Sequence, residues 1–193
     1  AEVSGLGATS YSAVQRFANH DISNDIRALL EKYAANDELR GFLVRMIWLG
    51  RLKELLPEAI QIAKSLDNSK YTRIAAFRAV AQLGDARIAQ DLRTHFLHES
   101  DELDREWLAE LVSETEPAPQ NCEWLLTALG KTKTKAKHSV DHLPQVVEEF
   151  IRDIDLEAVP GLLRGIYELV NQEPYVERMF DRGGRYLYYI VDE

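Results

Sequence analysis

Two histidines near the middle of the chain have a spacing that suits a metal ion. His138 and His142 are four residues apart and flank Asp141, so on a helix they would share one face, as zinc ligands do. The residue after the first histidine is Ser139, where a zinc protease has its glutamate. A solvated pair at the start of a helix is therefore the favoured interpretation, and we predict no metal site here.

A second histidine pair, His95 and His98, is followed by Glu99. The alternative to a metal site is packing, because Phe96 beside His95 indicates that this histidine lies at the edge of an apolar core. Packing is again favoured over metal binding.

Nucleophilic and phosphate-binding chemistry is also poorly represented. Cys122 is the only cysteine, which excludes an intrachain disulfide framework, and it has no neighbouring histidine that would activate a thiolate. Gly5 and Gly7 lack the further glycines and the lysine of a phosphate loop. We predict no catalytic residues and no cofactor, and the sequence itself does not decide whether the chain is an enzyme.

The strongest cationic run consists of alternating lysines. Threonine and alanine separate them, so a solvated loop is the simplest interpretation, and contact with phosphate or an acidic partner is the alternative. These candidate anion contacts are Lys131, Lys133, Lys135 and Lys137.

The overall charge argues against nucleic acid as a partner. The 193 residues include 23 Lys plus Arg and 32 Asp plus Glu, for a net charge of -9 and a pI near 5.1. Such a surface repels phosphate on average. Trp48, Trp107 and Trp124 could stack on bases, but Trp107 and Trp124 fall beside apolar stripes and are predicted to pack in the core.

No apolar run is long enough to span a membrane, and no export signal opens the chain. We therefore predict an acidic, cytoplasmic protein, and we expect its source to be bacterial.

The elements that would position these residues are helices. Apolar residues recur at helical spacing through most of the chain, and persuasive strand alternation is absent. Ser23 is expected to cap one helix and Gly50 to stop the next, while Pro57 predicts either a kink or a helix start. Expected helices cover residues 70–83, 86–98, 102–112 and 121–129, and a weaker last helix opens at Pro174.

These helices repeat with a fixed period. Arg40, Arg73 and Arg105 follow one another at steps of 33 and 32 residues, and Leu49-Gly50 returns 34 residues later as Leu83-Gly84. A two-helix unit by itself buries only one of its apolar faces, so neighbouring units must stack to complete a hydrophobic core. The recurring arginines are expected to pair with carboxylates between units. The predicted fold is all-α, a right-handed α-α superhelix of about five helix pairs.

One unit carries a family resemblance. Residues 71–85, YTRIAAFRAVAQLGD, resemble a HEAT-like repeat, with an early arginine, small alanines and a Leu-Gly-Asp turn. Its neighbours keep part of this pattern, since Arg51 replaces the aspartate in one turn and the glycine is missing near Ser113. The helical region of bacterial NACHT-type or STAND-type ATPases is a looser likeness, without any Walker sequence. Some HEAT-like proteins are enzymes. One of them, deoxyhypusine hydroxylase, holds two irons with several His-Glu pairs, whereas this sequence contains one such pair, His98-Glu99. A di-iron site of that kind is therefore not expected.

The predicted organisation is a lead-in over residues 1–10, HEAT-like repeats over 11–130, a basic loop over 131–138, and further helix pairs over 139–193. Both ends are candidate boundaries of a piece cut from a larger protein. We predict a protein-interaction or scaffold module that binds another protein, or another domain of its own polypeptide, along a concave surface. An enzyme or nucleic-acid-processing protein on the same scaffold is the alternative. The expected partner contacts are Arg40, Trp48, Tyr71, Arg73 and Arg105.

Overall fold

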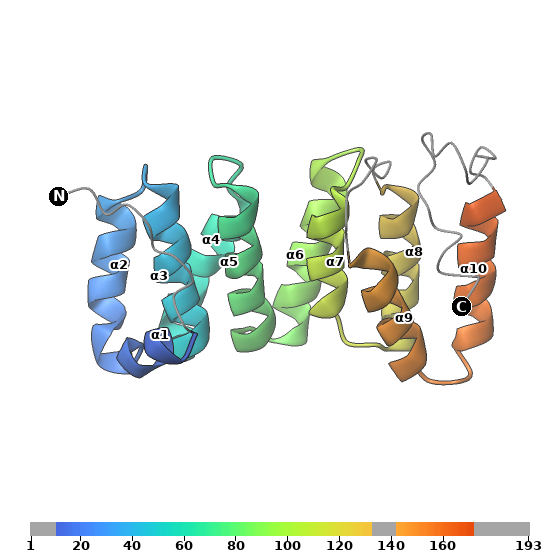
Figure 1. Ribbon diagram of the computed structural model, residues 1–193, viewed down its shortest axis with the longest axis horizontal. Helices are drawn as coiled ribbons and strands as arrows, with labels where there is room; N and C mark the ends of the chain where they lie inside the picture. The colour runs from blue at the N-terminus through green and yellow to red at the C-terminus, as the bar shows by residue number, and fades with distance from the viewer. Residues whose placement is uncertain (1–10, 133–141, 172–193) are drawn as a thin grey trace. The chain divides into compact units, whose positions relative to one another are not determined.

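The computed structural model describes residues 11–132 and 142–171 of the chain. These residues form α-helices joined by short turns, and their only strand-like feature is one isolated parallel bridge between Leu103 and Thr132. The predicted all-α helical-repeat fold is confirmed (Figure 1). The α-helices are α1 (Tyr11–Phe17), α2 (Ser23–Lys32), α3 (Asp37–Gly50), α4 (Leu56–Lys64), α5 (Lys70–Leu83), α6 (Ala86–Glu99), α7 (Arg105–Ser113), α8 (Cys122–Gly130), α9 (Leu143–Asp153) and α10 (Val159–Asn171).

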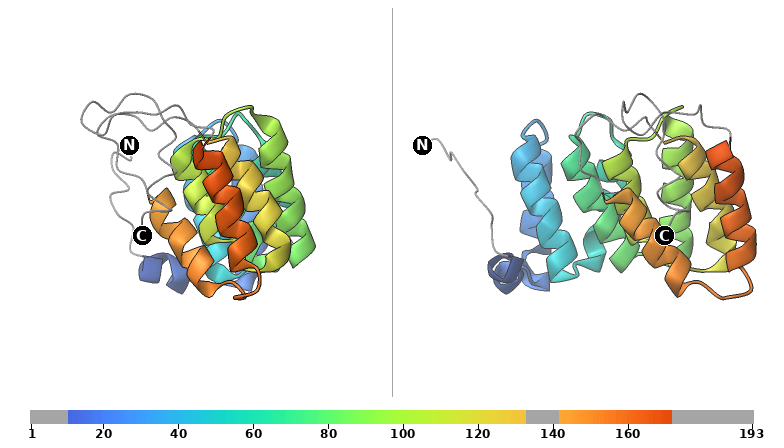
Figure 2. Two further views of the ribbon diagram at one scale, coloured as in Figure 1. Left: turned by 90° about the vertical axis from the view of Figure 1, so that its right-hand side faces the viewer. Right: turned by 45° about the vertical axis from the view of Figure 1, so that its right-hand side comes forward.

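The chain divides into two compact units, Ala1–Leu92 and Arg93–Glu193, with the division inside α6. In the first unit, α3 packs against both α1 and α5, and α4 packs against α5. In the second unit, α7 packs against α9, and α8 packs against α10, as Figure 2 shows. Helices two apart along the chain, such as α3 and α5 or α7 and α9, therefore lie side by side, and successive helices such as α4 and α5 also pack together, as expected for stacked helix pairs.

The first turns of α3 and α5 are fastened together by polar groups. The Asp37 carboxylate accepts a hydrogen bond from the Ser69 backbone N–H at 2.8 Å, and the Thr72 hydroxyl donates to the Asp37 carbonyl at 3.2 Å. Partial burial by itself raises the pKa of Asp37, but the hydrogen bonds from Ser69 and Thr72 outweigh it and lower the pKa. Gly41 lies beside this contact, and a Cβ there would stand 2.9 Å from the Thr72 hydroxyl oxygen. The missing side chain therefore lets α3 and α5 approach closely.

Three local expectations in the first unit can now be checked. Pro57 lies in the first turn of α4, so the helix-start alternative is confirmed. Ser23 is not the cap of α2: it is the first helical residue, and its hydroxyl donates to Glu54 at 2.7 Å. Helix α3 does end at Gly50, but the left-handed residue is Arg51, with φ 53°. Gly50 is instead needed for close packing, because a Cβ there would lie 2.6 Å from the Cβ of Ala18.

In the second unit, Phe96 of α6 is fully buried and meets Trp107 of α7 edge-on, with ring centroids 4.8 Å apart. The packing role predicted for Trp107 is confirmed. Helix α7 begins three residues later than expected, because Leu103 takes part in the bridge to Thr132. Asp104 then caps the helix by accepting from the Trp107 N–H at 3.0 Å.

Candidate partner-binding site

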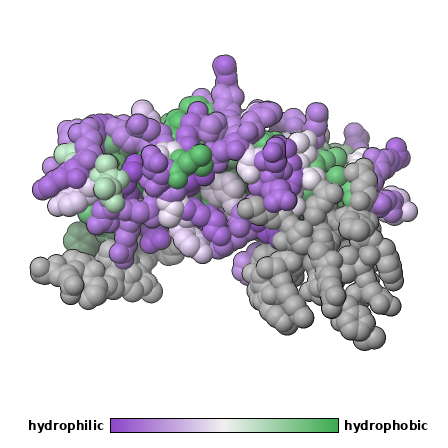
Figure 3. All heavy atoms as spheres, turned by 90° about the horizontal axis from the view of Figure 1, so that it is seen from above, coloured by the Kyte–Doolittle hydropathy of each residue, from purple (hydrophilic) through white to green (hydrophobic). Residues whose placement is uncertain are grey.

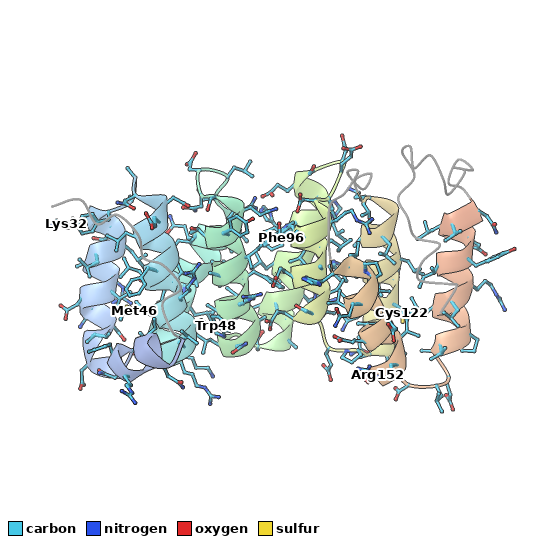
Figure 4. All side chains as sticks on the ribbon, in the orientation of Figure 1. Lys32, Met46, Trp48, Phe96, Cys122 and Arg152 are labelled. Carbon is cyan, nitrogen blue, oxygen red and sulfur yellow. The ribbon has the colours of Figure 1, made fainter. Side chains whose placement is uncertain are left out.

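The structure distributes the five predicted partner contacts over several places. Arg40, Trp48, Tyr71 and Arg73 belong to the first unit and Arg105 to the second. Tyr71 is 60% exposed, whereas Arg105 is buried. Trp48 is half-buried (Figure 4). The guanidinium carbon of Arg78 lies 5.5 Å from the centroid of the Trp48 ring, so Trp48 contributes to the contact between α3 and α5.

Two of the recurring arginines, Arg40 and Arg73, bind helix ends. Arg40 Nη1 donates to the carbonyl of Ala34, just after α2, at 3.0 Å, and Arg73 Nε donates to the carbonyl of Ala63, in the last turn of α4, at 2.8 Å. A cation at a helix C-terminus satisfies free carbonyls and complements the helix dipole. In these two contacts the acceptor is a backbone carbonyl, and the predicted pairing of the arginines with carboxylates stays a prediction. Lys131 repeats the arrangement, since its Nζ donates to the carbonyl of Leu97 at 2.6 Å.

Arg40 differs from Arg73 because it also lines a hollow. The hollow has a volume of about 370 Å³ and lies mainly between α2 and α4. It does not include Trp48, Tyr71 or Arg73. The residues around it are Arg27, Leu30, Glu31, Ala34, Arg40, Pro57, Glu58, Gln61 and Ile62.

An ion pair forms one wall of the hollow. Arg27 Nε donates to Glu58 Oε1 at 2.5 Å, and its two terminal nitrogens donate to the Asn24 side chain at 3.1 Å and to the Glu54 carbonyl at 3.0 Å. The pKa of Arg27 is raised chiefly by the hydrogen bond from its side chain to Glu58. This arginine is therefore held in one orientation by three acceptors, from Asn24, Glu54 and Glu58.

Two other polar atoms of the lining residues lack a hydrogen-bond partner within the described part of the chain. They are Glu58 Oε2, which can only accept, and Arg40 Nε, which can only donate. Both atoms are buried. A buried polar atom without a partner costs free energy, roughly 1–3 kcal/mol, so such pairs of atoms are uncommon unless a water or a ligand serves them.

Sequence reasoning found Arg40 but missed Arg27 and Glu58. A signal for them was present, because Arg27 and Glu58 are oppositely charged and 31 residues apart. Ser23 and Glu54 are hydrogen-bonded at the same separation. A separation close to the repeat period brings residues of α2 beside residues of α4 and of the short 3-10 helix Lys53–Leu55 that precedes it.

Comparison with known proteins identifies the repeats. The sequence matches the family of HEAT repeats over residues 24–113. The chain contains HEAT-like repeats. Neither curated proteins nor solved structures gave a match to it. The looser likeness to NACHT-type or STAND-type ATPases gains no support from these comparisons.

The hollow lies within the matched HEAT segment, since its lining residues run from Arg27 to Ile62. The face of the molecule in Figure 3 is mostly hydrophilic, with separate apolar side chains and no broad apolar area. Among the helices that the structure describes, none is both long and apolar enough to cross a membrane.

The histidines of this HEAT-like protein do not assemble a metal site within residues 11–132 and 142–171, where no group of three metal-binding side chains occurs. His95 Nε2 lies 3.5 Å from Glu99, and its ring meets Phe96 edge-on. His98 and His142 are exposed, and His138 lies outside the described residues.

The remaining candidates carry little reactive chemistry. Burial raises the pKa of the Cys122 thiol, which favours the unreactive protonated form. Trp124 lies beneath Arg93, 5.5 Å from the guanidinium carbon to the ring centroid, and is half-buried. Of the four lysines, Lys131 is bound to helix carbonyls, and Lys133, Lys135 and Lys137 lie outside the described residues.

Proposed function

We propose that this HEAT-like protein is a protein-interaction module that binds a segment of a partner, or of another domain of its own polypeptide, at the hollow between α2 and α4. HEAT repeats generally serve as scaffolds for protein interactions. We also propose that it does so in the cytoplasm, as part of a larger protein.

The observation that carries this proposal is the unused hydrogen-bonding capacity of Arg40 beside a hollow. Arg40 Nη1 donates to the Ala34 carbonyl, while Nε has no hydrogen-bond partner among the described residues. Arginine is enriched among the residues that dominate binding energy at interfaces, because its planar fork makes several directed bonds at once. A volume of about 370 Å³ is at the lower end of ligand-binding sites and suits one anchoring side chain better than a whole small molecule.

The other four predicted contacts remain proposals with less support than Arg40. They are Trp48, Tyr71, Arg73 and Arg105. None of them lines the hollow. Tyr71 is the most accessible of the four, and an exposed tyrosine at the start of α5 can supply contact area for a partner.

Peptide selection provides the test. Short random peptides are displayed, selected on the folded chain, and measured individually by fluorescence anisotropy. We expect Arg40→Ala to weaken binding of the selected peptides by about tenfold or more, since a buried charged hydrogen bond contributes roughly 1.5–3 kcal/mol. Arg45→Ala is the matched control, because Arg45 is an exposed arginine of the same helix and lies outside the hollow.

A second variant separates lost binding from lost folding. Ala34→Leu places a larger side chain at the rim of the hollow while keeping the backbone carbonyl that Arg40 binds. Ala34 is exposed, so the change is compatible with the fold. Selected peptides that bind the Arg40→Ala and Ala34→Leu proteins as tightly as the unmodified chain would contradict the proposal.

A further inference from the structure

The two unpartnered atoms around the hollow are complementary to each other. Arg40 Nε is a donor and Glu58 Oε2 is an acceptor, and both residues line the same hollow. One ligand group that carries an acceptor next to a donor could therefore serve both. An amide has this arrangement, with a carbonyl oxygen and an N–H on the same carbon.

The charges around the hollow argue against an ionic ligand. Arg27 and Arg40 are balanced by Glu31 and Glu58, so the lining carries no net charge. A carboxylate would find a donor at Arg40 but would meet like charge at Glu58, where it offers no proton. An ammonium group would meet the converse conflict. A neutral amide meets neither.

Apart from Gln61, the uncharged residues of the lining are apolar. Leu30, Ala34, Pro57 and Ile62 provide surface for a short aliphatic stem. A backbone amide within an extended peptide has bulky neighbours on both sides, whereas a side-chain amide at the end of a methylene stem can enter a hollow of about 370 Å³. Glutamine and asparagine have this form.

We infer that the hollow between α2 and α4 is a binding site for a glutamine or asparagine side chain presented by the partner, with Arg40 donating to the amide oxygen and Glu58 accepting from the amide nitrogen. The inference rests on the proposed function and adds the chemistry of the anchor. Arg40 Nε and Glu58 Oε2 have almost no accessible surface, so both side chains must turn toward the hollow before the amide can reach them. Glu58 keeps its bond to Arg27 through the other oxygen.

The test uses blocked amino acids as probes and NMR as the readout. The ¹⁵N-labelled chain is titrated with N-acetyl-glutamine methylamide and separately with the glutamate, lysine and norleucine analogues. We expect the glutamine probe to shift the amide signals of Arg40, Glu58 and Ile62 and to bind at about millimolar concentration, as fragments of this size do. The three other probes should bind about tenfold more weakly or not at all, because each leaves a buried polar atom unpaired or opposes a like charge.

A single substitution should reverse the preference. In Glu58→Gln the carboxylate is gone, Arg40 and Arg27 are no longer fully balanced, and the glutamate probe should bind more tightly than the glutamine probe. Ala34→Leu should abolish binding of every probe, and Arg45→Gln should leave all of them unchanged. The amide spectrum of each variant shows whether its fold is intact.

The outcomes separate the two proposals. Equal binding of the glutamine, glutamate and norleucine probes, or binding of none, overturns the inference. If selected peptides nevertheless depend on Arg40, the proposed function stands with a different anchor. If selected peptides ignore Arg40 as well, both proposals fail.

Discussion

Replacing Gly41 by alanine tests whether close stacking of α3 on α5 holds the first unit together. Glycine inside a helix costs about 1 kcal/mol relative to alanine, so α3 alone should gain that amount from the change. In the folded chain the new Cβ would stand 2.9 Å from the Thr72 hydroxyl oxygen, which must then move. Movement costs Thr72 its hydrogen bond to the Asp37 carbonyl, about 1 kcal/mol, and crowding adds about 1–2 kcal/mol. We expect a net loss of about 1–2 kcal/mol.

Removing the Thr72 hydroxyl should reverse the effect of Gly41→Ala on stability. In a Thr72→Ala background the hydroxyl is absent, so Gly41→Ala should stabilise the chain by about 1 kcal/mol through helix propensity. The coupling energy between the two positions should thus be about 2–3 kcal/mol, within the range found for residues in direct contact.

Native-state hydrogen exchange of the α3 and α5 amides is the appropriate assay, because it reports the opening free energy of this unit rather than of the whole chain. The four proteins of the cycle are compared under the same conditions. If Gly41→Ala raises protection equally in both backgrounds, α3 and α5 do not approach each other as described, and the reasoning is refuted.

Three further predictions concern other parts of the chain. Gly165→Ala should leave the chain about 1–2 kcal/mol less stable than Gly161→Ala in thermal unfolding, because the Cβ at residue 165 must displace the Leu126 side chain, whereas Gly161 has open space around it and its change should be neutral or stabilising by up to about 1 kcal/mol. Asp37 has a lowered pKa in the folded chain, so its stabilising effect is present above its unfolded pKa of about 3.9 and is lost as the pH falls through the folded value. The stability difference between the unmodified chain and Asp37→Asn, measured by urea titration, should therefore shrink below about pH 4, and a constant difference would contradict the assignment. Phe96→Ala should cost about 3–5 kcal/mol and alter tryptophan fluorescence, since Phe96 is fully buried against Trp107; a loss below about 1 kcal/mol would show that this contact is not part of the core.

Much of the fold could be predicted because apolar periodicity and the recurrence of arginine are local properties of the sequence. The bounds expected for the helix at Lys70–Leu83 agree with α5, where Ser69 supplies a strong capping signal. The start of α7 was misplaced because a tertiary contact, the bridge between Leu103 and Thr132, keeps the residues before Asp104 out of the helix. The local sequence does not predict a contact between residues so far apart in the chain.

The candidate site was less accessible to sequence reasoning. Arg40 was selected because it recurs, yet recurrence reflects its binding to a helix end, a role that it shares with Arg73. What distinguishes Arg40 is the hollow beside it, which depends on the spacing of α2 and α4 and on the small side chain of Ala34. Volume of this kind follows from packing in three dimensions, so a single sequence does not predict it.

Contacts between a bound peptide and methyl groups of the hollow would test the central claim most directly. With Leu30 and Ile62 methyl-labelled, intermolecular NOEs are recorded for the tightest selected peptide. The account predicts NOEs from one peptide side chain to both residues, because both line the hollow at which the partner is anchored. A bound peptide that shows NOEs only to residues outside the hollow, such as Leu66, which is 71% exposed, would contradict it.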